Sequence, residues 1–140
     1  MHYVPWSDVL KLIDKAPNAE WRALLAFLRL TGCRAPSEVH DLRWTDLDFA
    51  DRKITIRSPK TKHLGGRHAV RSCPMFPELV PYLEELAEAV GPGIQVPMSN
   101  QVFPVVKDSQ TNLRTAIERM IKLAGLEQWP KLIQNLRSSR

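Results

Sequence analysis

The sequence has few cysteines and no long apolar run. Its two cysteines, Cys33 and Cys73, are too few for a disulfide framework and do not form a metal-type pair. No apolar stretch approaches the roughly 20 residues that a membrane-spanning helix needs. The start, Met1 to Asp8, lacks the basic and then apolar regions of a signal peptide. We therefore expect a chain of the reducing cytoplasm, without a membrane, a metal or another cofactor.

The composition is ordinary for one globular domain. The 140 residues are 44% hydrophobic and 25% charged, and they contain no internal repeat and no low-complexity segment. A chain of this length can bury a core of its own. We expect residues 1–140 to form a single domain.

The positive charge is concentrated in one segment. The formal net charge is +5, and residues 43–71 hold eight Lys or Arg against three Asp, so this segment carries the whole excess. His63 and His68 lie inside it. Such a segment is typical of a phosphate-binding surface, although a solvated hairpin would have the same composition.

Hydrophobic periodicity predicts an α+β domain. Apolar residues at three- and four-residue spacing indicate helices over Pro5–Lys15, Glu20–Leu30, Pro77–Val90 and Leu113–Ala124. Alternation indicates strands over Trp44–Phe49, Lys53–Ser58 and Arg67–Cys73, joined by turns at 50–52 and 60–66. The expected fold is mostly helical, with a small three-stranded antiparallel sheet and a basic second turn. Val102 and Phe103 are candidates for one further short strand.

Arg34 lies in a tight junction between two predicted helices. Gly32 suits the left-handed residue that ends the helix before it, and Pro36 suits the first position of a helix that runs to Leu42. A fixed guanidinium in such a junction can bind the oxygens of a phosphate or carboxylate. A structural role, with the stem packed along apolar neighbours, stays open at this point.

Three stretches together resemble the tyrosine recombinases, the phage integrase family. The stretch Thr31-Gly-Cys-Arg-Ala-Pro-Ser-Glu38, running on to Leu42-Arg-Trp-Thr-Asp46, resembles the first arginine box of that family. Ser58-Pro-Lys-Thr-Lys62 is similar to the hairpin that carries the family's lysine, and Gln134-Asn-Leu-Arg137 to its His-x-Leu-Arg box. The resemblance covers the chain from about Val4 to Arg140. It implies the integrase-like catalytic core and site-specific DNA recombination through a 3′-phosphotyrosyl bond.

The resemblance also implies roles for single residues. Arg34 and Arg137 would hold the reacting phosphate, and Lys60 would be the general acid, with Lys62 as the alternative. Gln134 stands where the family usually has histidine; it can donate a hydrogen bond but cannot carry a proton, so acid–base work there is in doubt. Residues expected to bind duplex DNA are Arg57, Lys62, His63 and Arg67.

The family's tyrosine nucleophile has no counterpart at the expected place. It follows the second arginine box, as does a second histidine, and the sequence ends three residues after Arg137. Tyr3 and Tyr82 lie in other segments. We therefore expect a truncated catalytic core that binds DNA as a monomer without cutting it. The parent protein would cut DNA and assemble as a tetramer on it.

Three other functions fit parts of the sequence. The first is a non-catalytic DNA-binding module from a degenerate integrase. The second is a metal site built from His63, His68 and Cys73, although their spacing matches no metal signature. The third is a protein-interaction domain that uses the acidic face of the helix predicted over Pro77–Val90.

Overall fold

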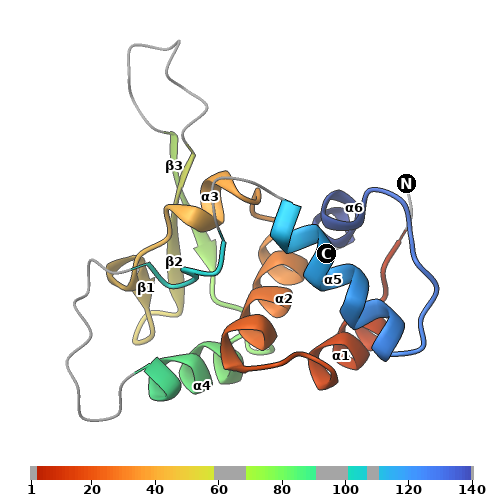
Figure 1. Ribbon diagram of the computed structural model, residues 1–140. Coiled ribbons are helices and arrows are strands. Elements are labelled where there is room, and N and C mark those ends of the chain that lie inside the picture. The colour runs from red at the N-terminus through yellow and green to blue at the C-terminus, as the bar shows by residue number, and fades with distance from the viewer. Residues whose placement is uncertain (1–2, 59–68, 91–100, 107–110, 140) are drawn as a thin grey trace.

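The computed structural model describes residues 3–58, 69–90, 101–106 and 111–139 (Figure 1). Within these ranges the chain forms six α-helices and one three-stranded antiparallel sheet, which confirms the predicted α+β class. The helices are α1 (Trp6–Asp14), α2 (Ala19–Thr31), α3 (Ser37–His40), α4 (Val80–Val90), α5 (Thr111–Leu123) and α6 (Leu132–Ser138). Among the described residues we find no helix with the length and hydropathy of a membrane span.

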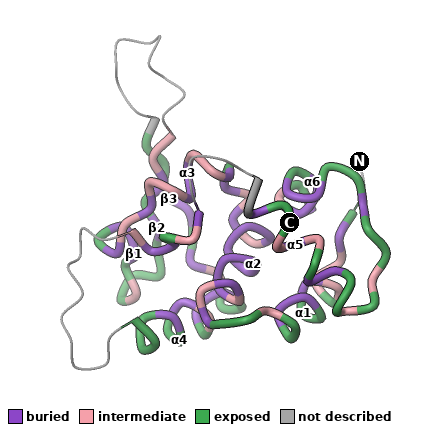
Figure 2. Tube along the Cα trace, in the orientation of Figure 1, coloured by how far each residue is buried: buried purple, intermediate pink, exposed green. Residues whose placement is uncertain are grey.

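Helix α2 is the centre of the hydrophobic core. It packs against α1, α4 and α6, and its middle turns are buried on all sides (Figure 2). The side chain of Asn18 caps its start by accepting a hydrogen bond from the Trp21 N–H at 3.0 Å. The ring of Phe27 lies 5.4 Å from that of Phe103, centroid to centroid. Because α2 is held on several sides, its C-terminal end is a fixed platform for the residues that follow.

The sheet contains β1 (Leu47–Asp48), β2 (Lys53–Ser58) and β3 (Ala69–Pro74), in that order. Strand β2 has the predicted bounds. Ile54 and Ile56 are buried, whereas Lys53 and Thr55 are exposed, as alternation requires. Ile54 pairs with Leu47 on one side and with Cys73 on the other. The sheet lies beside the helices (Figure 1), and segment 59–68 between β2 and β3 is outside the described residues.

The strand predicted over Trp44–Phe49 is wrong for its first half. Residues Trp44–Asp46 form a 3-10 helix, and only Leu47–Asp48 pair as a strand. The cause is the side chain of Asp46, which accepts a hydrogen bond from the Arg43 N–H at 2.9 Å and so stabilises a tight turn. Burial of Trp44 then follows from its place in this turn rather than from an alternating strand.

Other boundaries also differ from the prediction. The helix expected over 36–42 is a single turn, α3, and α4 begins at Val80 after a turn at 77–79. Val102 and Phe103 are not in a strand; Gln101 beside them makes an isolated bridge with Arg43. Helix α6 was not predicted, because its seven residues are too short for a clear periodicity.

Candidate anion-binding site

Arg34 lies in the junction between α2 and α3 that the sequence predicts. Gly32 has the left-handed backbone (φ 69°) that ends α2, and its N–H donates to the Leu28 carbonyl at 3.1 Å. The Arg34 carbonyl accepts hydrogen bonds from the N–H groups of Glu38 and Val39 at 3.0 and 3.1 Å. The main chain around Arg34 is thus held by hydrogen bonds before and after this residue. Arg34 itself is exposed to solvent.

The carboxylate of Glu38 is the central acceptor of this junction. Glu38 is only 3% exposed. Its Oε1 accepts from the Arg34 N–H at 2.8 Å, and its two oxygens accept from the Arg71 guanidinium at 2.6 and 3.1 Å. Burial alone would raise the pKa of Glu38, but the hydrogen bonds from Arg71 and Arg34 outweigh it and hold the pKa below its usual value. Glu38 is therefore ionised at neutral pH.

Arg71 on β3 is a site residue that sequence reasoning missed. The bidentate bond to Glu38 raises the pKa of its guanidinium. Its position inside the basic segment 43–71 indicated a possible role in anion binding. The sequence around a strand residue does not show which distant residue it contacts. Arg71 joins the hairpin strands to the loop that carries Arg34.

Arg137 reaches the same junction from α6. Its Nε and Nη2 donate to the Gly32 carbonyl at 3.2 and 3.1 Å. Burial lowers the pKa of Arg137; the positive charges of Arg34 and Arg71 lower it further, and Glu38 opposes them. Three arginines thus lie near one carboxylate, and only Arg71 binds it through its guanidinium. The junction has an excess of positive charge, which a bound anion would reduce.

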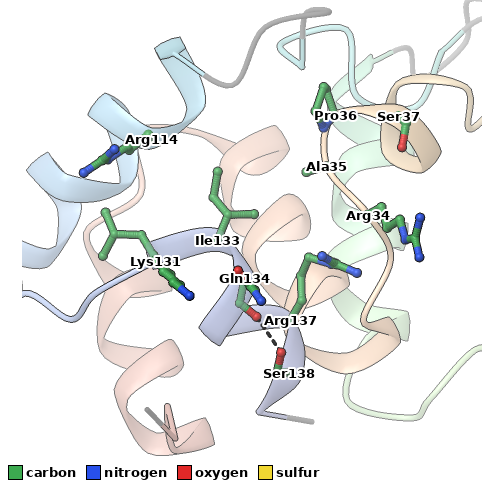
Figure 3. Close-up of a pocket in the computed structure, with 11 residues that line it drawn as sticks. Arg34, Ala35, Pro36, Ser37, Arg114, Lys131, Ile133, Gln134, Arg137 and Ser138 are labelled. Atoms are coloured by element: carbon green, nitrogen blue, oxygen red, sulfur yellow. Dashed lines mark hydrogen bonds between the residues drawn. The ribbon is translucent and has the colours of Figure 1, made fainter. Parts of the chain in front are cut away.

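An open pocket of about 850 Å³ brings three of the four predicted catalytic residues together (Figure 3). Arg34 lines it from the junction, and Gln134 and Arg137 line it from α6. Arg114 of α5 and Lys131, both absent from the sequence prediction, line it as well. The fourth residue, Lys60, lies outside the described residues. Cationic groups and amide N–H groups both bind oxyanions, and the side chains that line this pocket include both.

The predicted DNA-binding residues divide into two groups. Arg57 on β2 forms an ion pair with Asp46, whose side chain is 4% exposed, so part of its charge is already compensated. The other three, Lys62, His63 and Arg67, lie in segment 59–68, outside the described residues. Of the four predicted DNA-binding residues, the described structure therefore contains only Arg57.

Neither tyrosine of the chain lines the pocket. The hydroxyl of Tyr3 accepts from Arg29 at 3.3 Å, and the Arg29 guanidinium lies 5.7 Å from the centre of its ring. Tyr82 is on α4 and packs against the core. Both are engaged away from Arg34 and Arg137.

The described residues contain no group of three His, Cys, Asp or Glu that could hold a metal ion. Of the metal site considered from the sequence, His63 and His68 lie outside the described residues, and Cys73 is buried.

Burial raises the pKa of the Cys33 thiol to about 11, so Cys33 is protonated at neutral pH and a poor nucleophile.

The sequence model of the phage integrase family matches residues 4–138. The chain therefore belongs to the phage integrase family. Among curated protein sequences, none matches it.

Solved structures of recombinases share the fold. XerA recombinase superposes with a TM-score of 0.73 and 22% identity, over 98% of this chain and 47% of that one. XerH site-specific recombinase bound to difH substrate, in a pre-cleavage complex, gives 0.64 and 23%, over 95% and 38%. Its post-cleavage complex with palindromic difH gives 0.62 and 20%, over 98% and 40%. The predicted catalytic-core fold is confirmed, and the chain spans less than half the length of these recombinases.

Proposed function

We propose that the chain is the phosphate-binding core of a tyrosine recombinase, which cuts and rejoins DNA at specific sites through a 3′-phosphotyrosyl intermediate. The supporting observation is that Arg34 and Arg137, from two separate family boxes, line one pocket with an excess of positive charge. The solved XerH complexes, which contain difH substrate, are consistent with DNA as the partner.

In this proposal the two arginines act on the phosphate that reacts. When a tyrosine oxygen attacks phosphorus, negative charge grows on the non-bridging oxygens, and fixed guanidinium donors stabilise it. Gln134 adds an amide donor beside Arg137, but it cannot transfer a proton. Lys60, or Lys62, would protonate the 5′ oxygen that leaves.

The nucleophile comes from elsewhere in this proposal. Because Tyr3 and Tyr82 are held away from the pocket, we assign the attacking tyrosine to a part of the intact recombinase outside these 140 residues. The chain alone would then bind duplex DNA as a monomer, and the intact protein would assemble as a tetramer on DNA in the cytoplasm.

A second candidate function is a DNA-binding module that no longer cuts. Gln134 favours it, because the family's usual histidine at this position can exchange a proton and glutamine cannot. Both candidates predict the same phosphate pocket. They differ in whether the intact protein forms a covalent link to DNA, which a suicide substrate measures.

The direct test is a titration of a labelled DNA duplex with the chain at two salt concentrations. We expect weak binding with little sequence preference and with an affinity that falls steeply with salt, because phosphate contacts release counterions. Arg34→Ala and Arg137→Ala should each weaken binding about 10- to 100-fold, the range expected for a lost charge-assisted hydrogen bond.

Arg119→Ala is the matched control, because Arg119 is exposed on α5 and does not line the pocket. It should bind DNA nearly as well as the wild type. Binding that is absent at low salt, or that Arg34→Ala and Arg137→Ala reduce no more than Arg119→Ala does, would overturn the proposal.

A further inference from the structure

Lys131 precedes α6 with a backbone that does not suit lysine. Its φ and ψ are 47° and 59°, the left-handed region, which glycine and asparagine adopt far more readily than lysine. It occupies the N-cap position, where a short side chain with an oxygen normally accepts a hydrogen bond from the helix, and its side chain makes no such bond. Local structure therefore favours asparagine or glycine at this position, and lysine needs another reason.

The side chain of Lys131 extends the row of donors on α6. Lys131, Gln134 and Arg137 follow one another at three-residue spacing, so each lies near the next around the helix, and all three line the pocket (Figure 3). Six residues of helix correspond to about 9 Å along the axis. The row thus extends along the pocket beyond Arg137, which lines it together with Arg34.

We propose that Lys131 binds a second phosphate of the DNA backbone, next to the one that Arg34 and Arg137 hold. This rests on the proposed function of the site. Successive phosphates of one strand are spaced by about 3.4 Å of helix rise, so a row of this length faces more than one. A pocket of about 850 Å³ also lies in the range of about 300–1,000 Å³ that takes a drug-sized ligand, which leaves room beside a single phosphate.

Lysine fits this task chemically. Its ammonium is a compact charge on a flexible stem, which binds a phosphate without requiring one fixed geometry. Arg114 also lines the pocket, but its Nε donates to Glu118 at 3.0 Å, and Figure 3 shows its guanidinium directed away from the α6 row. We therefore assign the second phosphate to Lys131 rather than to Arg114.

Two variants of Lys131 separate binding from folding. Lys131→Gly removes the charge and suits the left-handed backbone, so its thermal midpoint should equal or exceed that of the wild type. Lys131→Arg keeps the charge. Lys11→Ala is the control, since Lys11 is an exposed lysine that lines a different pocket, beside α1. Each protein is titrated with the same duplex between 50 and 200 mM salt.

We expect Lys131→Gly to reduce the slope of log K against log salt by about 0.9, the value for one phosphate contact. The affinity ratio of wild type to Lys131→Gly should accordingly fall about 3.5-fold between 50 and 200 mM. Lys131→Arg and Lys11→Ala should keep the wild-type slope.

Three outcomes would overturn the inference. If Lys131→Gly keeps the wild-type slope while Arg137→Ala loses affinity, Lys131 contacts no phosphate and the proposed function stands. If Lys131→Gly and Lys131→Arg both unfold at lower temperature and bind equally poorly, the lysine has a structural role. If the wild-type chain binds no duplex even at 50 mM salt, the proposed function fails, and this inference fails with it.

Discussion

The carboxylate of Glu38 and the guanidinium of Arg71 form a bidentate pair, with distances of 2.6 and 3.1 Å. Glu38 is on α3 and Arg71 on β3, so the pair joins the arginine junction to the strand that leads out of the hairpin. The same carboxylate accepts from the Arg34 N–H. One buried acid therefore positions the main chain of Arg34 and fixes the hairpin strands against it.

Replacement of Glu38 by glutamine should destabilise the fold by about 2 kcal/mol, because it leaves charge-assisted hydrogen bonds unmade at a buried site. Arg71 is half exposed and can turn toward water, which limits the loss. Urea unfolding measures the change. The control Glu118→Gln removes an exposed i,i+4 partner of Arg114 and should change the free energy of unfolding by no more than about 0.5 kcal/mol. Equal effects of the two variants would contradict this account.

The stability of the wild type should depend on pH through Glu38. Its pKa in the folded state lies below its ordinary value, so the native state binds this proton less readily than the unfolded chain does. The contribution is complete above the unfolded pKa of about 4.3 and is lost as the pH falls through the folded pKa. In urea titrations from pH 7 to pH 3, the difference between wild type and Glu38→Gln should shrink below about pH 4. A constant difference would show that Glu38 is not the titrating group.

Two glycines offer a matched pair. Gly32 and Gly125 both have left-handed backbones, with φ 69° and 72°, and follow α2 and α5. Alanine at either position should cost about 1 kcal/mol of stability, because its Cβ strains this conformation. The carbonyl of Gly32 accepts from Arg137, and relief of the strain at an alanine there would displace this carbonyl and the arginine bonded to it. Gly32→Ala should therefore also weaken DNA binding, and Gly125→Ala should not. If the two variants change the affinity for DNA equally, Arg137 does not contribute to the anion-binding site.

The chain alone should form no covalent adduct with DNA. A suicide substrate, a nicked duplex that traps the phosphotyrosyl link, should give no protein–DNA band that survives denaturation. The intact recombinase should give such a band, and its absence there would favour the non-cutting module. A band from the chain itself that disappears in Tyr82→Phe would show that Tyr82 reaches the phosphate, against its packing on α4.

Local rules predict those parts of the molecule that local interactions decide. Gly32 ends α2 because few other residues accept its backbone, and the alternation of Ile54 and Ile56 sets the bounds of β2. The placement of Arg34 follows from such signals. Its place in one pocket with Arg137 was expected only from the family resemblance, since no spacing rule joins residues so distant.

The features that sequence reasoning missed depend on tertiary contacts. The turn at Trp44–Asp46 exists because the Asp46 side chain bonds to the Arg43 N–H, although the local pattern also fits a strand. Helix α6 follows a left-handed Lys131, which contradicts the usual start signals. The role of Arg71 depends on Glu38, 33 residues earlier in the chain.

The hydrogen bond between Arg137 and the Gly32 carbonyl joins residues 105 positions apart. The entropy lost in closing so long a loop must be met before this contact can form, and contacts of high sequence separation slow folding. During synthesis the first arginine box, with Arg34, leaves the ribosome about a hundred residues before the second box, with Arg137. A nascent chain thus carries Arg34 without the second arginine, and a complete anion site arises only after α6 has been made and docked.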